Sequence, residues 1–122
     1  MGRIFDISIK QGIAISTLFG DTEPTALPHQ GWQIETHSAA GIDYALLTAI
    51  ESAAEFPLHA DENAWFGYVV AGAGELLLGD QDSVTESVTY QAGDVIVFQP
   101  DTFHGWKVAS SETKLLFAKP TC

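Results

Sequence analysis

Glycine, proline and aspartate recur along this chain about every 8 to 12 residues, and short runs of β-branched and aromatic residues lie between them. Such short runs suit strands of roughly four to eight residues better than helices. No segment shows a convincing helical period. We therefore predict an all-β fold, a sandwich or barrel of antiparallel strands with little or no helix.

The predicted strands follow from these runs. Two short strands flank Gly12 within residues 3–19, and residues 21–31, with two prolines, form a loop. Residues 44–50 could form a short helix, but their length and their neighbours favour a strand. Gly72 and Gly74 mark a predicted hairpin. The remaining strands are predicted at 32–37, 64–70, 75–79, 95–98, 104–108 and 114–118, with a weak edge strand within 81–89.

The charge balance restricts the partners. Five lysines and arginines stand against 16 aspartates and glutamates, which gives a formal charge of −11 over 122 residues. A field of that sign repels phosphate backbones and anionic lipid surfaces, so we expect neither nucleic acid nor membranes as partners. It tolerates cations, divalent metals included. The length and the 46% apolar content fit a single domain, residues 1–122, with one core.

Other features indicate an intracellular protein. The only cysteine, Cys122, is the last residue, so no intramolecular disulfide forms and a reducing compartment fits. No apolar run approaches the ~18 residues of a membrane-spanning helix. The N-terminus has no hydrophobic signal core. We expect a cytoplasmic location, and we expect His29 and His37 to be surface residues.

Two other histidines are candidates for function. His59 and His104 each stand beside a predicted strand and a turn, and a fold that brings them together would form a pocket with two imidazoles. Asp61 shares a face with His59 if this stretch is extended. Two imidazoles and a carboxylate are the donors of a site for Fe(II), Mn, Ni, Zn or Cu. Histidines are also ordinary turn residues, so the spacing alone leaves the metal open.

The strand that follows has one face toward this pocket. Trp65, Gly67 and Val69 share that face by their spacing, and Phe66, Tyr68 and Val70 take the other. Glycine inside a strand leaves space opposite whatever fills a pocket, so Gly67 is a predicted pocket residue.

The stretch from Pro57 to Trp106 resembles the cupins, small antiparallel barrels of jelly-roll type (double-stranded β-helices), and in particular small RmlC-like single-domain members. The first motif of that family has two histidines, a glutamate and a glycine. His59 matches its first histidine and Gly72 its glycine, whereas Asp61 stands at the second histidine and Trp65 at the glutamate. We expect the barrel core at about residues 40–118.

The second cupin motif is similar to the stretch that begins at Gly93-Asp94. Pro100 and His104 also match it, and Thr102 lies near the motif glycine. The Gly-Asp-Val-Ile-Val-Phe-x-Pro stretch and the Tyr-Val-Val-x-Gly-x-Gly-Glu-Leu stretch together carry the resemblance.

The resemblance implies two functional hypotheses. In the first, the protein is an enzyme that acts on a small metabolite, and His59, Asp61 and His104 hold one divalent transition metal weakly. A metal-free variant of this enzyme would use His59 or His104 as the catalytic general acid or base. In the second, the site has lost its metal and binds a sugar or an aromatic molecule between the histidines and Trp65, Phe103 or Trp106.

The resemblance also implies a homodimer. Small cupins pair through N-terminal strands and sheet faces, and the apolar segment 3–19 suits the covering of a partner's sheet edge.

Overall fold

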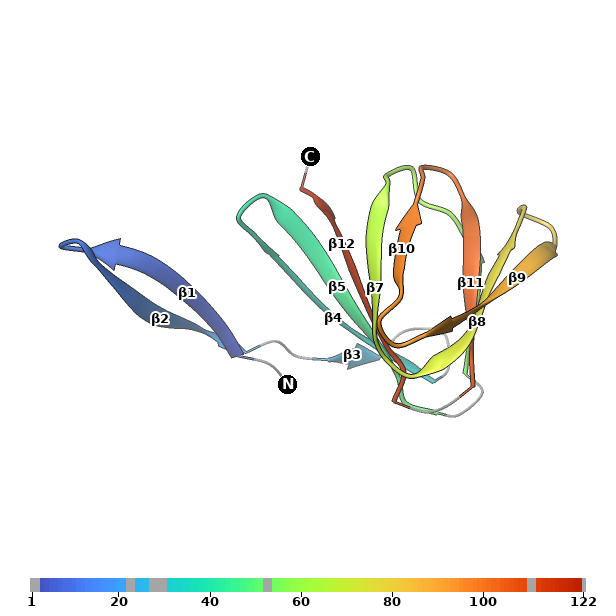
Figure 1. Cartoon of the computed structure of the whole chain (residues 1–122), viewed down its shortest axis with the longest axis horizontal. Helices are drawn as coiled ribbons and strands as arrows, with labels where there is room; N and C mark the ends of the chain where they lie inside the picture. Colours follow the sequence, from blue (N-terminus) through green and yellow to red (C-terminus); the bar gives the residue numbers. More distant parts are fainter. Residues whose placement is uncertain (1–2, 22–23, 27–30, 52–53, 110–111, 122) are drawn as a thin grey trace.

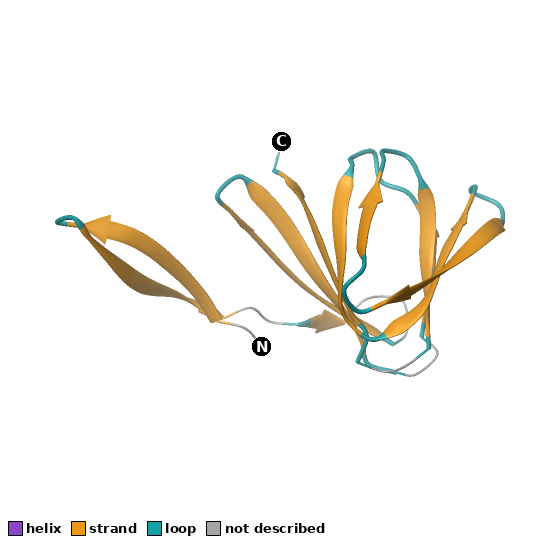
Figure 2. Ribbon diagram, viewed as in Figure 1, coloured by secondary structure: helices purple, strands orange, loops and turns teal. Residues whose placement is uncertain are grey.

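The computed structural model describes residues 3–21, 24–26, 31–51, 54–109 and 112–121, and every regular element among them is a strand (Figure 2). This confirms the predicted all-β antiparallel fold. None of the described elements is a helix of membrane-spanning length. The strands are β1 (Arg3–Lys10), β2 (Ile13–Asp21), β3 (Thr25–Ala26), β4 (Trp32–Ala39), β5 (Ile42–Ala49), β6 (Glu55–His59), β7 (Trp65–Ala71), β8 (Ala73–Gly79), β9 (Val84–Gln91), β10 (Val95–Phe98), β11 (Phe103–Val108) and β12 (Lys114–Pro120).

Two sheets form the barrel. One has six strands in the order β10-β7-β12-β5-β4-β3, and the other has four in the order β6-β11-β8-β9. The hairpin of β1 and β2 forms a separate sheet that extends away from the barrel (Figure 1). Every strand pair is antiparallel, and neighbours in a sheet are often distant in sequence.

The core is rich in aromatic rings. Trp106 is 1% exposed and packs edge-on against Tyr90, with ring centroids 5.4 Å apart, and also against Phe117 at 5.7 Å. The alternation of β7 carries through as predicted: Val69 is buried, whereas Phe66 and Tyr68 face outward. Because side chains alternate across a strand, one face of each sheet supplies the core.

The predicted hairpin at Gly72 is wrong. The strands on either side, β7 and β8, lie in different sheets and do not pair with each other. Gly72 has a φ of +89°, and a Cβ there would lie 2.6 Å from the Cα of Thr113. Glycine therefore lets the chain turn from one sheet into the other beside a buried strand end.

Other expectations need smaller changes. The loop predicted at 21–31 contains the two-residue strand β3. His37 lies away from the core face of β4 but is half-buried, edge-to-face with Tyr44 at 6.1 Å. His29 and Cys122 lie outside the described residues.

Gly72→Ala is expected to destabilise the fold more than Gly41→Ala does. Both glycines have positive φ, but a Cβ at Gly41 meets nothing within 4 Å. Gly41→Ala therefore isolates the backbone cost of about 1 kcal/mol, and Gly72→Ala adds a steric cost that brings the total above about 3 kcal/mol. Urea denaturation gives both free energies of unfolding. If both variants lost the same free energy of unfolding, Thr113 would have to move away from the new methyl group without cost, and the predicted steric effect would be wrong.

Candidate functional site

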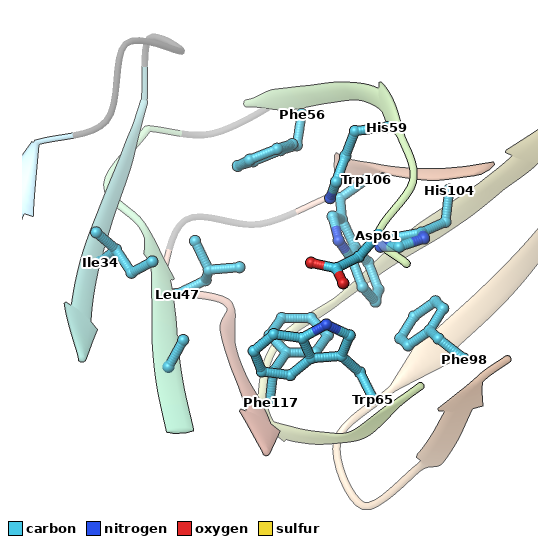
Figure 3. Close-up of a pocket in the computed structure, with 11 residues that line it drawn as sticks. Ile34, Leu47, Phe56, His59, Asp61, Trp65, Phe98, His104, Trp106 and Phe117 are labelled. Atoms are coloured by element: carbon cyan, nitrogen blue, oxygen red, sulfur yellow. The ribbon is translucent and has the colours of Figure 1, made fainter. Parts of the chain in front are cut away.

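A cavity of about 210 Å³ lies inside the barrel, between the two sheets. Figure 3 shows the residues that line it. Eight are apolar and come mainly from the six-stranded sheet. Three are polar, and they gather on the wall formed by β6, β11 and the turn after β6. The lining residues are Ile34, Ala45, Leu47, Phe56, Trp65, Phe98, Trp106, Phe117, His59, Asp61 and His104.

The strand register brings the two histidines together. β6 pairs with β11, and His59 stands directly opposite His104. Their ring centroids are 4.4 Å apart. The pairing is irregular between His104 and Trp106, where a Cβ on Gly105 would lie 2.5 Å from the carbonyl oxygen of Phe56. Only glycine allows β6 to approach β11 this closely.

Backbone carbonyls orient both imidazoles. The Nδ1 atom of His59 lies 3.0 Å from the carbonyl oxygen of Pro57, and Nδ1 of His104 lies 3.0 Å from that of Thr102. A carbonyl oxygen only accepts hydrogen bonds, so each Nδ1 carries a proton. In the neutral ring, Nε2 then has a free lone pair.

His104 is the more deeply buried histidine. Its side chain is 7% exposed and lies against the Phe98 ring, with centroids 4.2 Å apart. Burial lowers the pKa of His104 because the charged ring loses hydration, and nearby His59 lowers it further. The Thr102 carbonyl and Asp61 oppose this shift only in part. His104 is therefore a neutral acceptor at neutral pH.

Asp61 is held as a carboxylate. Its Oδ1 atom accepts hydrogen bonds from the backbone N–H of Asn63 at 2.7 Å and from the Asn63 side-chain amide at 2.9 Å. The Asn63 backbone bond is the main cause of a lowered pKa, and it outweighs partial burial. The Asn63 amide, the Trp65 indole and Lys119 lower the pKa further.

One cation stands near this wall. The Nζ atom of Lys119 lies 5.6 Å from the centre of the Trp65 ring and makes a 3.0 Å ion pair with Asp43. Lys119 was not a candidate from the sequence, because no motif or spacing connects the end of β12 with Asp61.

Five of the predicted pocket residues do line the cavity: His59, Asp61, Trp65, His104 and Trp106. Two predicted pocket residues do not. Phe103 lies on the opposite side of β11 from His104, since neighbouring side chains alternate. Gly67 is buried under the Phe98 and Phe117 rings, each 3.3 Å from where a Cβ would stand. Its missing side chain makes room for those rings and not for a ligand.

Sequence reasoning missed most of the apolar wall. Phe98 and Phe117 lie at alternate inward positions of β10 and β12, which a known strand register would have revealed. Ile34, Ala45 and Leu47 come from β4 and β5, before the motif stretch. Only the sheet order brings these strands to the cavity.

The donor set fits a metal only in part. Within the described ranges, no group of three or more histidine, cysteine, aspartate or glutamate side chains is arranged to hold an ion. The two imidazoles meet, but Oδ1 of Asp61 is engaged by Asn63. Trp65, which offers no metal ligand, occupies the neighbouring wall. The three-ligand metal site therefore stays a prediction.

Comparison with known proteins assigns the family. A model of the cupin domain matches residues 46–118, which is more than half of the chain, so this protein belongs to the cupins. No curated protein matches the sequence.

Solved structures confirm the jelly-roll fold. KdgF from a Halomonas species superimposes with a TM-score of 0.66 at 21% identity, over 80% of this chain and 86% of that one. An RmlC-like cupin from Shewanella frigidimarina superimposes with a TM-score of 0.63 at 17% identity, over 100% of this chain and 96% of that one. Oxalate decarboxylase from Bacillus subtilis, which has Mn(II) centres, superimposes with a TM-score of 0.67 at 14% identity, over 82% of this chain and 27% of that one. At these identities the likeness shows the fold alone.

The pKa of His104 predicts how stability depends on pH. Its folded pKa lies below the unfolded value of about 6.5, so the unfolded chain binds more protons in that range. Stability should therefore fall as pH drops from 7.5 to 5.5, with a slope of at most about 1.4 kcal/mol per pH unit from this group. His104→Gln should flatten the slope in urea denaturation, whereas His37→Gln, remote from the cavity, should keep it. If the pH dependence of stability were unchanged in His104→Gln, the lowered pKa of His104 would not be its cause.

Proposed function

We propose that this cupin binds a small organic molecule with an apolar, ring-sized body and a hydrogen-bond-donating end. The observation that carries the proposal is the division of the cavity into an apolar wall of eight residues and a polar wall of three. Cavities of about 150 Å³ already hold benzene, so about 210 Å³ suits one substituted ring.

The polar wall supports the donor character of the ligand. His59 and His104 both use Nδ1–H to bond a backbone carbonyl, which leaves their Nε2 atoms as acceptors. Asp61 is anionic, and a carboxylate only accepts hydrogen bonds. Hydroxyl or ammonium groups satisfy such a wall, whereas carboxylate or phosphate groups would meet acceptors and negative charge.

The histidine pair suits proton transfer. A neutral Nε2 of His104 can accept a proton from a bound hydroxyl, and His59 stands 4.4 Å away, centroid to centroid. We propose this as the chemistry that these two residues would supply if the ligand is a substrate.

A second candidate function is weak binding of one divalent metal, Fe, Mn, Ni, Zn or Cu. The hydrogen bonds from both Nδ1 atoms to carbonyls support it, because metal-binding histidines are usually oriented in this way. His59 and His104 would hold the ion, and Asp61 would join them through its second oxygen. A bound metal would supply Lewis-acid polarisation of a ligand oxygen.

Matched ligands test the organic proposal. Catechol and benzylamine should raise the melting temperature of the protein and change its tryptophan fluorescence, whereas benzoate, of similar size, should do neither. Asp61→Asn should weaken benzylamine binding about tenfold in calorimetry, since a charge-assisted hydrogen bond contributes about 1.5 kcal/mol or more.

Asp80→Asn is the control for this loss. Asp80 also accepts backbone hydrogen bonds in a turn, from Asp82 and Ser83, but it does not line the cavity. Its variant should bind as the natural protein does. Tighter binding of benzoate than of benzylamine would contradict the acceptor wall.

Metal content tests the second candidate. Protein purified without an affinity tag and incubated with each divalent metal should retain, after dialysis, more metal than the His59→Ala/His104→Ala variant. Elemental mass spectrometry gives the ratio. Equal and negligible contents in both proteins would remove the metal hypothesis and leave the organic one intact.

A further inference from the structure

Lys119 lies beside the cavity, on the inward side of the six-stranded sheet. It follows the cavity residue Phe117 by two positions in β12, so the two side chains leave the same face of that strand. The neighbouring strand β5 repeats this arrangement, because Asp43 stands directly opposite Lys119 and precedes the cavity residue Ala45 by two positions. The charged pair therefore extends the apolar wall by one further inward-facing step.

The ammonium group of Lys119 is fixed from several sides. Its Nζ atom donates to Oδ2 of Asp43 at 3.0 Å and to the carbonyl oxygen of Pro120 at 3.1 Å. Asp43 is itself held, because its Oδ1 atom accepts hydrogen bonds from the hydroxyls of Ser38 at 2.6 Å and Thr121 at 3.1 Å. Only 16% of the Lys119 side chain is exposed. This cation is therefore better ordered and less hydrated than an ordinary surface lysine.

A further contact of the same ammonium group is with the Trp65 ring. The Nζ atom lies over the indole, 5.6 Å from its centre. Trp65 lines the cavity, and its indole N–H donates a hydrogen bond to the Asp61 carboxylate. A continuous series of contacts therefore leads from the ion pair, through the indole, to the carboxylate of the polar wall.

We propose that Lys119 is a positioning residue for the candidate site, which holds the Trp65 indole in the orientation that donates to Asp61. A cation over an aromatic ring favours the ring orientation that keeps the face toward the charge. Without Lys119 the indole loses this constraint on its side-chain torsions, and Asp61 loses a donor for part of the time. The effect on ligands rests on the proposed function, because Lys119 itself does not line the cavity.

The charge of Lys119 also acts directly on Asp61. The backbone hydrogen bond from Asn63 is the main cause of the lowered pKa of the Asp61 carboxyl, and the Lys119 charge adds to it. Removal of this charge would by itself make the cavity more attractive to a cation such as benzylamine. A neutral ligand such as catechol responds little to that change, so its affinity reports the position of the indole.

Fluorine NMR of the ligand-free protein, labelled with fluorotryptophan, tests the positioning role. The chain has three tryptophans, and Trp65→Phe assigns the Trp65 resonance by its disappearance. Lys119→Met should shift and broaden this resonance alone, whereas Lys119→Arg, which keeps a cation over the ring, should leave it near its natural position. Lys114→Met, at an exposed lysine of the same strand, is the control and should change none of the three. A general loss of stability would instead disturb the buried Trp32 and Trp106 as well.

Hydrogen exchange of the indole N–H groups gives a second readout without ligand. The Trp65 N–H should exchange with deuterium about fivefold faster in Lys119→Met, because its hydrogen bond to Asp61 is formed less often. Asp43→Asn keeps the lysine charge and removes its charged anchor, so a smaller change in the same direction is expected.

Calorimetry with catechol connects the indole position with the proposed function. Lys119→Met should bind catechol about fivefold more weakly than the natural protein does, and Lys119→Arg should restore most of the affinity. If Lys119→Met kept the natural catechol affinity, Trp65 resonance and exchange rate, the positioning role would be wrong and the proposed function would stand. If the natural protein bound no catechol while Lys119→Met still changed the Trp65 resonance and exchange rate, the positioning role would stand and the ligand proposal would fail.

Discussion

The register between β6 and β11 is the constraint on which the candidate site depends. It sets His59 against His104, and Gly105 permits it because a Cβ there would press on the Phe56 carbonyl. A slip of one residue would turn one histidine to the outside of the sheet. The carbonyls that bind both Nδ1 atoms lie two residues earlier in each histidine's own segment, so the local backbone determines the tautomer and direction of each imidazole, and the strand pairing determines its place.

The cavity combines a costly polar wall with a large apolar one. The burial of His104 and the partial burial of His59 and Asp61 are tolerated because each has a local partner: a carbonyl two residues earlier for each histidine, and Asn63 for Asp61. These partners engage Nδ1 and one carboxylate oxygen. The Trp65 indole also hydrogen-bonds Asp61 and lowers the pKa of that carboxyl, so less of the carboxylate is left for a metal ion. Within the described residues, no group of three or more metal-ligating side chains forms.

The barrel and the hairpin divide the charge and the apolar surface differently. The barrel buries its aromatic core and carries all of the net negative charge, whereas the hairpin is neutral and exposes isoleucines and a phenylalanine. A chain that packed these residues internally would need a third layer. The structure leaves these hairpin side chains exposed, and it also exposes valines and aromatic rings on the outer face of β7 and β10.

Local patterns in the sequence determined the all-β class, most strand positions and the phase of β7, because turn residues and two-residue alternation act within a few residues. The motif stretch also identified His59, Asp61, Trp65, His104 and Trp106 as cavity residues. Only the tertiary structure decided that Gly72 joins two sheets, that Phe103 and Gly67 do not line the cavity, and that Ile34 and Leu47 do. Those facts depend on sheet order and register between strands far apart in the chain, which no local pattern encodes.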